Sequence, residues 1–99
     1  MEDVIYYNNL YDLYGCLLTD KQKQYFEDYY FNNLSLGEMA DNYNVSRNAI
    51  FKQIHTAIEK LEEYEENLHF LSKLDKLYRI IDSSGNDKLK KQIDNLFLS

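Results

Sequence analysis

The chain has 99 residues, a net charge of -6, and 44% hydrophobic residues that include ten tyrosines and five phenylalanines. This length suits one domain, and the apolar content is too high for a disordered chain. No run of about 18 apolar residues occurs and the first residues are acidic, so the sequence predicts neither a membrane span nor a secretory signal. We therefore expect one cytoplasmic globular domain that covers residues 1–99.

The chain shows no pattern of residues that is typical of a catalytic or metal site. Its single cysteine, Cys16, stands beside Leu17 and Leu18, where a cysteine is usually a small buried hydrophobic residue. Neither histidine has a partner at metal-ligand spacing, so we interpret His55 as a surface residue. Because the sequence also lacks a glycine-rich phosphate loop, we expect no enzyme, no cofactor and no metal.

Helix signals begin at the first residues and dominate the whole chain. Proline is absent, and apolar residues recur every three or four positions, which favours an all-α fold. Asp3 can cap a first helix over about 4–14, and Gly15 follows at the position where a left-handed residue ends a helix. The sequence thus predicts that the first helix ends at this glycine.

Two capping boxes mark the next two helices. Thr19 followed by Gln22 opens a helix over about 20–31, and Ser35 followed by Glu38 opens a short helix over about 36–42. In each box the side chain of the first residue accepts a hydrogen bond from the backbone N–H three residues later. The side chain of that later residue in turn accepts a hydrogen bond from the backbone N–H of the first residue.

The segment after the third helix has the features of a helix-turn-helix turn. Asn44 tolerates the left-handed backbone that reverses the chain, Val45 is expected in the core, and Ser46 can cap a fourth helix. Ala40 supplies the small residue where two such helices cross. These features predict a helix-turn-helix unit over about 19–60. The alternative is an ordinary polar loop between two helices, which would have the same composition.

Projection of the fourth helix separates a buried face from a polar face. Apolar residues fall on one side at about 100° per residue; they are Ile50, Ile54, Ala57, Ile58 and Leu61. On DNA, the first turns of such a helix enter the major groove, where Arg can read guanine and Asn can read adenine. The candidate nucleic-acid-binding residues are Ser46, Arg47, Asn48, Phe51, Lys52 and His55. The alternative is that these are polar residues of a solvated helix.

Residues 61–99 form a predicted C-terminal helical extension. Apolar residues at Leu61, Tyr64, Leu68 and Leu71 step by three and four, as a coiled-coil seam would, and the stripe goes on to Ile81. A linker over 82–87, in which Ser83, Ser84 and Gly85 break the helix, precedes a last helix over about 87–98. This stripe, together with the tyrosine-rich first helix, favours a homodimer.

Four stretches within residues 18–68 form a recognisable pattern; they are Leu18-Thr19, Leu34 to Glu38 with Ala40, Val45 to Arg47, and Leu61 to Glu65. With this pattern, residues 18–68 resemble the YlxM family of small helix-turn-helix proteins and, more distantly, the promoter-reading helix-turn-helix region of sigma factors. The resemblance implies an all-α, sigma-factor-like helix-turn-helix domain and a regulatory or accessory role in the signal recognition particle pathway. The many arginines of sigma-like readers are scarce here.

The distribution of charge leaves two functional hypotheses open. Residues 1–45 carry -6 and 61–82 carry -3, whereas 46–60 carry +2 and 83–99 carry +1. The candidate reading helix is therefore positive, but two excess charges predict weak DNA binding unless a dimer doubles them. One hypothesis is a regulator that binds duplex DNA. The alternative is an accessory protein that contacts a protein or RNA component of the signal recognition particle system without reading DNA.

Overall fold

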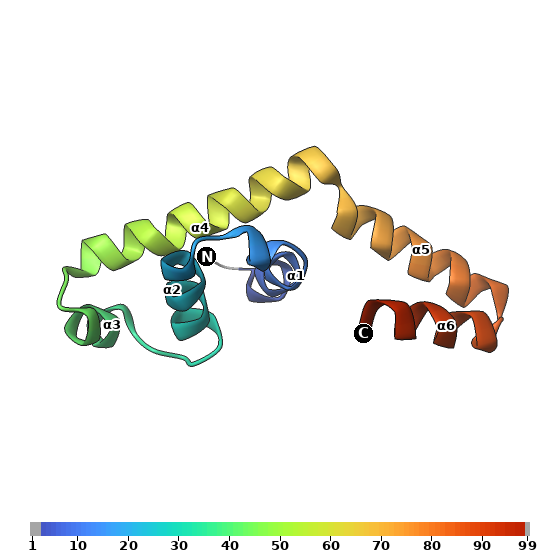
Figure 1. The fold of residues 1–99 in the computed structure, drawn as a ribbon, viewed down its shortest axis with the longest axis horizontal. Helices are drawn as coiled ribbons and strands as arrows, with labels where there is room; N and C mark the ends of the chain where they lie inside the picture. Colours follow the sequence, from blue (N-terminus) through green and yellow to red (C-terminus); the bar gives the residue numbers. More distant parts are fainter. Residues whose placement is uncertain (1–2, 99) are drawn as a thin grey trace. The chain divides into compact units, whose positions relative to one another are not determined.

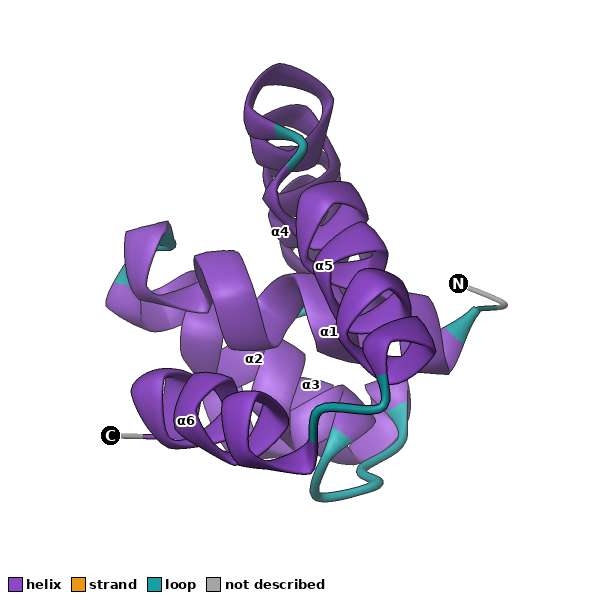
Figure 2. Ribbon diagram, turned by 90° about the vertical axis from the view of Figure 1, so that its right-hand side faces the viewer, coloured by secondary structure: helices purple, strands orange, loops and turns teal. Residues whose placement is uncertain are grey.

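The computed structural model describes residues 3–98, and all of its regular secondary structure there is helical (Figures 1 and 2). The elements are α1 (Val4–Tyr14), the 3₁₀ helix η1 (Gly15–Leu17), α2 (Asp20–Tyr30), α3 (Leu36–Tyr43), α4 (Arg47–Leu68), α5 (Phe70–Ser84) and α6 (Asp87–Leu98). The predicted all-α class is confirmed. Within residues 3–98, no helix is both long and apolar enough to span a bilayer.

The chain divides into two compact units, residues 1–68 and 69–99. The first unit holds α1 to α4 and therefore the whole helix-turn-helix segment. The second unit is the helical pair α5 and α6. The single domain over 1–99 stays a prediction.

Side-chain caps fix where the first helices begin. Asp3 accepts a hydrogen bond from the backbone N–H of Tyr6 at 3.0 Å. Both predicted capping boxes are present, with Thr19 and Gln22 at α2 and with Ser35 and Glu38 at α3. Each box satisfies backbone N–H groups that have no partner inside the helix. Local sequence therefore determines these three helix starts.

The core of the first unit lies along one face of α4, against which α1, α2 and α3 all pack (Figure 1). All five α4 residues that the projection placed inward are buried, as predicted. Leu10 of α1, Phe26 of α2 and Met39 of α3, the helices that contact α4, are fully buried as well. Ala40 is also buried, as the close crossing of α3 requires.

A buried carboxylate holds α2 to α3. The Asp28 side chain, only 6% exposed, accepts hydrogen bonds from the Gln24 and Asn32 amides at 3.1 Å and from the Tyr43 hydroxyl. Burial, followed by the bond to this carboxylate, raises the pKa of Tyr43 to about 12. Since Tyr43 is the last residue of α3, this bond fixes α3 against α2.

The tyrosines of α1 are used inside the first unit. The Tyr11 hydroxyl donates to Glu27 of α2 at 2.7 Å, and the Tyr14 hydroxyl donates to Glu65 of α4 at 2.6 Å. The Tyr11 ring also stacks on Phe26 with centroids 4.5 Å apart. These contacts account for tyrosines that the sequence had linked to a homodimer.

Two predictions at the end of α1 are wrong. Gly15 has φ -56°, a right-handed conformation, and begins η1 instead of ending α1 with a left-handed residue. It is buried, and a Cβ there would lie 3.0 Å from the Tyr11 ring, so close packing is the reason for a glycine at this position. Cys16, predicted buried, is exposed because the 3₁₀ turn directs it away from the core.

Two predictions around α4 are also wrong. Val45, expected in the core, is 40% exposed because the turn places it outside the packed helix faces. The coiled-coil seam from Leu61 to Leu71 does not continue, since His69 takes a left-handed conformation with φ 54° and ends α4 after Leu68. Local backbone geometry thus divides a stripe that is continuous in sequence.

The second unit is a pair of helices joined at Gly85, which takes a left-handed conformation with φ +67°. The predicted linker over 82–87 is too long, because α5 continues through Ser83 and Ser84 and only Gly85 and Asn86 separate it from α6. Lys90 pairs with Asp82 at 2.9 Å near the turn, and the rings of Phe70 and Phe97 meet with centroids 6.4 Å apart. The last helix covers the predicted residues 87–98.

Candidate nucleic-acid interface

The turn between α3 and α4 has the predicted backbone geometry. Asn44 adopts φ 56° and ψ 48°, and the Val45 N–H donates to the Ala40 carbonyl at 3.0 Å. Ser46 follows, and its hydroxyl oxygen accepts from the Ala49 N–H at 3.1 Å to begin α4. Three residues therefore reverse the chain, and each has an identifiable structural role.

The polar face of α4 is open to solvent where the sequence placed it. Four of the candidate residues, Arg47, Asn48, Lys52 and His55, are exposed, while Ile50 and Ile54 between them are fully buried. The other two candidates, Ser46 and Phe51, are exposed as well. One side of this helix is thus anchored in the core and the other is available for contact.

Arg47 lies against α3 instead of extending freely from α4. A Cβ added to Gly37 would come within 2.9 Å of the Arg47 Nη2 atom and 3.2 Å of its Nε atom. The guanidinium therefore covers a position of α3 that only glycine leaves vacant. Sequence reasoning missed Gly37; the available signal was a glycine in the first turn of a short helix, where helix propensity disfavours it.

Phe51 and His55 form an aromatic pair one turn further along α4. Their rings stack with centroids 5.8 Å apart and an interplanar angle of 14°. His55 also approaches Glu59, with Nε2 and Oε1 3.3 Å apart, in a pair whose side chains are both more than half exposed. Phe51 is 44% exposed, so an apolar surface lies within the polar face.

The surroundings of this face are acidic. On α3, which precedes the turn, Glu38 and Asp41 are exposed, and α3 contains no basic residue. Further along α4, Glu62, Glu63 and Glu66 are exposed. Phosphates that approach α4 would therefore be attracted only near its first two turns.

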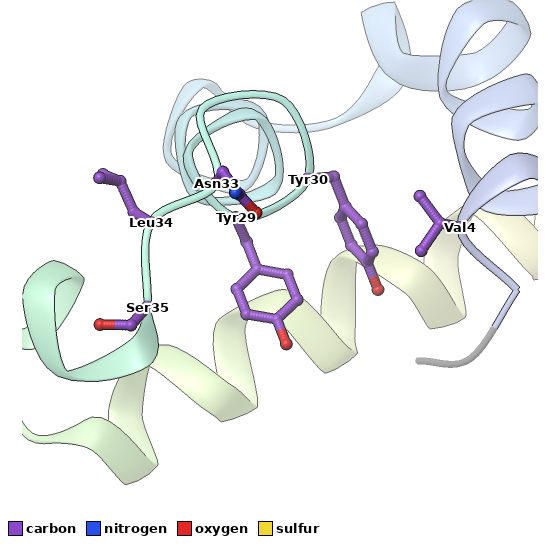
Figure 3. A pocket seen from close by; sticks show the side chains of 6 residues that line it. All are labelled: Val4, Tyr29, Tyr30, Asn33, Leu34 and Ser35. Atoms are coloured by element: carbon purple, nitrogen blue, oxygen red, sulfur yellow. The ribbon is translucent and has the colours of Figure 1, made fainter.

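A separate pocket of about 450 Å³ lies between α1, α2 and the loop before α3 (Figure 3). Its lining residues are Val4, Tyr29, Tyr30, Asn33, Leu34 and Ser35. The rings of Tyr29 and Tyr30 extend from α2 in the same general direction, with Tyr30 on the side of Val4 (Figure 3). None of the candidate reading residues lines this pocket. Across residues 3–98, no group of three or more His, Cys, Asp or Glu side chains could hold a metal ion.

A short helix, a three-residue turn with a left-handed asparagine, and a second helix with one buried and one exposed face define the helix-turn-helix class of proteins. Residues 1–97 match the family model described as "Putative helix-turn-helix protein, YlxM / p13 like". The chain belongs to this family, which is named UPF0122. It is a helix-turn-helix family and not a family of enzymes.

Curated relatives from several bacteria carry the same family name. The chain is 48% identical over 68 residues to a UPF0122 protein of Shouchella clausii, a match that covers 69% of this chain and 62% of that protein. It is 41% identical over 87 residues to a UPF0122 protein of Halalkalibacterium halodurans, covering 88% of this chain and 75% of the relative. It is 43% identical over 82 residues to one from Geobacillus kaustophilus, covering 83% and 74%.

Proposed function

We propose that this protein is a cytoplasmic regulator that binds duplex DNA through the first two turns of α4. The observation that carries the proposal is the division of α4 beside the turn, where Ile50 and Ile54 are fully buried and Arg47, Asn48 and Lys52 are exposed. A reading helix needs this division, because side chains reach base edges only from a helix whose opposite face is held by the domain.

Each side chain of the face has a chemical role in this proposal. Arg47 can donate two hydrogen bonds to guanine, and Asn48 can both donate to and accept from adenine. Lys52 and the Ser46 hydroxyl can contact phosphate, and the Phe51–His55 pair offers an apolar surface to a thymine methyl group. Gly37 sets where the Arg47 guanidinium lies before DNA arrives.

Affinity should depend on assembly. Residues 46–60 carry only two excess positive charges, and the acidic residues of α3 and distal α4 oppose DNA binding. A homodimer would present two reading helices and four excess positive charges to two half-sites. We therefore include a homodimer in the proposed function.

The test measures binding of Arg47→Ala and Lys52→Ala to duplex fragments from the protein's own gene neighbourhood at several salt concentrations. Arg47→Ala should cost about 1–3 kcal/mol on the preferred sequence, because a bidentate base contact is lost. Lys52→Ala should weaken all sequences alike and reduce the salt slope by about 0.9.

Lys60→Ala is the matched control. Lys60 is on the same helix and carries the same charge, but it lies beyond the first two turns and pairs with Glu63 at 3.6 Å. The Lys60→Ala variant should bind DNA nearly as well as the wild-type protein does. Absence of binding to every duplex at low salt, or wild-type affinity in both reading-face variants, would refute DNA reading.

A second candidate function is favoured by the charge of the first unit. Residues 1–68 hold thirteen acidic and five basic residues, a net charge of -8, which suits a basic protein partner better than DNA. In this alternative the protein is an accessory factor that contacts a protein or RNA component of the signal recognition particle system. A pull-down with and without DNase separates the two, since a contact with a protein or an RNA survives DNase treatment and a DNA contact does not.

A further inference from the structure

The α5–α6 unit has almost no core of its own. Among its described side chains, only Ile81 is buried. The remaining large apolar residues of the stripe are exposed or half-buried; they are Phe70, Leu71, Leu74, Leu77, Tyr78, Leu89, Ile93, Leu96 and Phe97. Two helices of 15 and 12 residues with one buried side chain cannot supply the burial that a stable fold needs.

The apolar residues form one stripe on each helix. At about 100° per residue, Leu74, Leu77 and Ile81 share a face of α5, and Lys76 and Arg79 lie on the opposite face. On α6, the same projection groups Leu89, Ile93, Leu96 and Phe97.

Polar and aromatic contacts keep the two helices side by side. Asp82 pairs with Lys90 at 2.9 Å near the turn, and Phe70 meets Phe97 at the other end. Midway, the Tyr78 hydroxyl is hydrogen-bonded to Asp94, a contact that raises the pKa of this phenol. The apolar stripes of both helices are therefore held on one antiparallel pair.

We propose that this surface, defined as the stripe of α5 and α6, is the contact of a homodimer, in which the same helix pair of a second copy covers it. Two such pairs, stripe to stripe, make a four-helix bundle with a common core. The proposal concerns the homodimer of the proposed function and does not depend on DNA binding.

The α5–α6 pair of a second copy matches the stripe of α5 and α6 better than the first unit of that copy does. The exposed large apolar residues of the first unit are dispersed over α1, η1, the end of α2, the turn and α4; they are Val4, Ile5, Leu17, Phe31, Val45, Phe51 and Leu68. Phe51 and Leu68 of α4 are far apart along the helix, so this unit presents no stripe that matches α5 and α6. An identical helix pair does.

Charge and area are compatible with this occupant. The second unit holds six basic and four acidic residues, and the bases opposite the stripe point away from such a contact, so repulsion between copies is weak. Phe70, Leu89, Leu96 and Phe97 are 43%, 38%, 70% and 43% exposed. They offer on the order of 400 Å² per copy, which with a polar rim reaches the lower end of specific interfaces, about 1,200 Å² in total.

The test is sedimentation equilibrium of the full chain from about 1 to about 200 μM, a range that brackets the micromolar affinity expected of a small interface. Wild type should change from the 11.9 kDa monomer toward twice that mass. Leu96→Asp should shift the dissociation constant at least tenfold upward.

Ile80→Asp is the matched control, since Ile80 is 67% exposed, much like Leu96, but projects about 90° from the centre of the α5 stripe. It should dimerise as wild type does. Leu89→Asp is a second variant on the stripe, and circular dichroism checks that every variant keeps its helix content.

The salt dependence of dimerisation distinguishes a contact between two stripes from a contact between the stripe unit of one copy and the first unit of the other. A dimer that forms through the apolar stripe should be as strong or stronger at high salt, whereas docking of the basic helix pair on an acidic first unit should weaken. A wild-type monomer throughout the range, equal effects of Leu96→Asp and Ile80→Asp, or a dimer that dissociates with salt would each overturn the proposal. A dimer that fails to bind DNA would leave it intact.

Discussion

The bond between Tyr43 and Asp28 gives the sharpest test of how the helix-turn-helix angle is held. Tyr43→Phe removes one of the three side-chain donors to a carboxylate that is 6% exposed, while the amides of Gln24 and Asn32 remain at 3.1 Å. A hydrogen bond to a charged group contributes about 1.5–3 kcal/mol, and the two remaining donors place the loss in the lower half of that range. For a unit of this size, such a loss lowers Tm by roughly 6–18 °C.

The assay is urea unfolding followed by far-ultraviolet circular dichroism, with thermal unfolding beside it. Tyr29→Phe is the control, because Tyr29 is another half-buried tyrosine of the first unit and its hydroxyl makes no hydrogen bond to a residue within 3–98. This control should change the free energy of unfolding by about 0.5 kcal/mol or less. If Tyr43→Phe is as stable as Tyr29→Phe, the carboxylate does not hold α3 in place and the reasoning fails.

Three further predictions concern pH, the glycine under the arginine and the cap of α4. Because the folded pKa of Tyr43 is about 12 against an ordinary 10.0, stability should be complete below pH 10 and decline from pH 10 to 12, and Tyr43→Phe should lessen this decline in urea unfolding. Gly37→Ala should raise the stability of α3 by up to about 1 kcal/mol. It should also reduce DNA affinity toward that of Arg47→Ala, because the new methyl group displaces the Arg47 guanidinium. A Gly37→Ala variant that binds DNA as tightly as wild type would contradict this prediction. Ser46→Ala should cost about 1 kcal/mol in thermal unfolding by removing the cap of α4, and an unchanged Tm would show that the cap is dispensable.

The local sequence determined where the first helices begin and how the helix-turn-helix reverses. Capping boxes at Thr19 and Ser35 and the left-handed Asn44 need only a few neighbouring residues, so their signals are complete in the sequence. The buried face of α4 was also predictable, because a period of 3.6 residues fixes which side chains share a face. The same periodicity placed Asn48, Lys52 and His55 on the exposed side, with Arg47 along its edge, and all four are exposed.

Tertiary packing decided the features that depend on residues far apart in the chain. Gly15 is needed because a Cβ there would lie 3.0 Å from the Tyr11 ring, and Val45 is exposed because the turn lies outside the packed faces. Composition alone could not show that Arg47 rests on Gly37 or that Asp28 is buried among three donors, since each contact needs two helices brought together at one angle. Caps and periodicity act over one or two helical turns, whereas burial and side-chain direction are set by the neighbours that folding supplies.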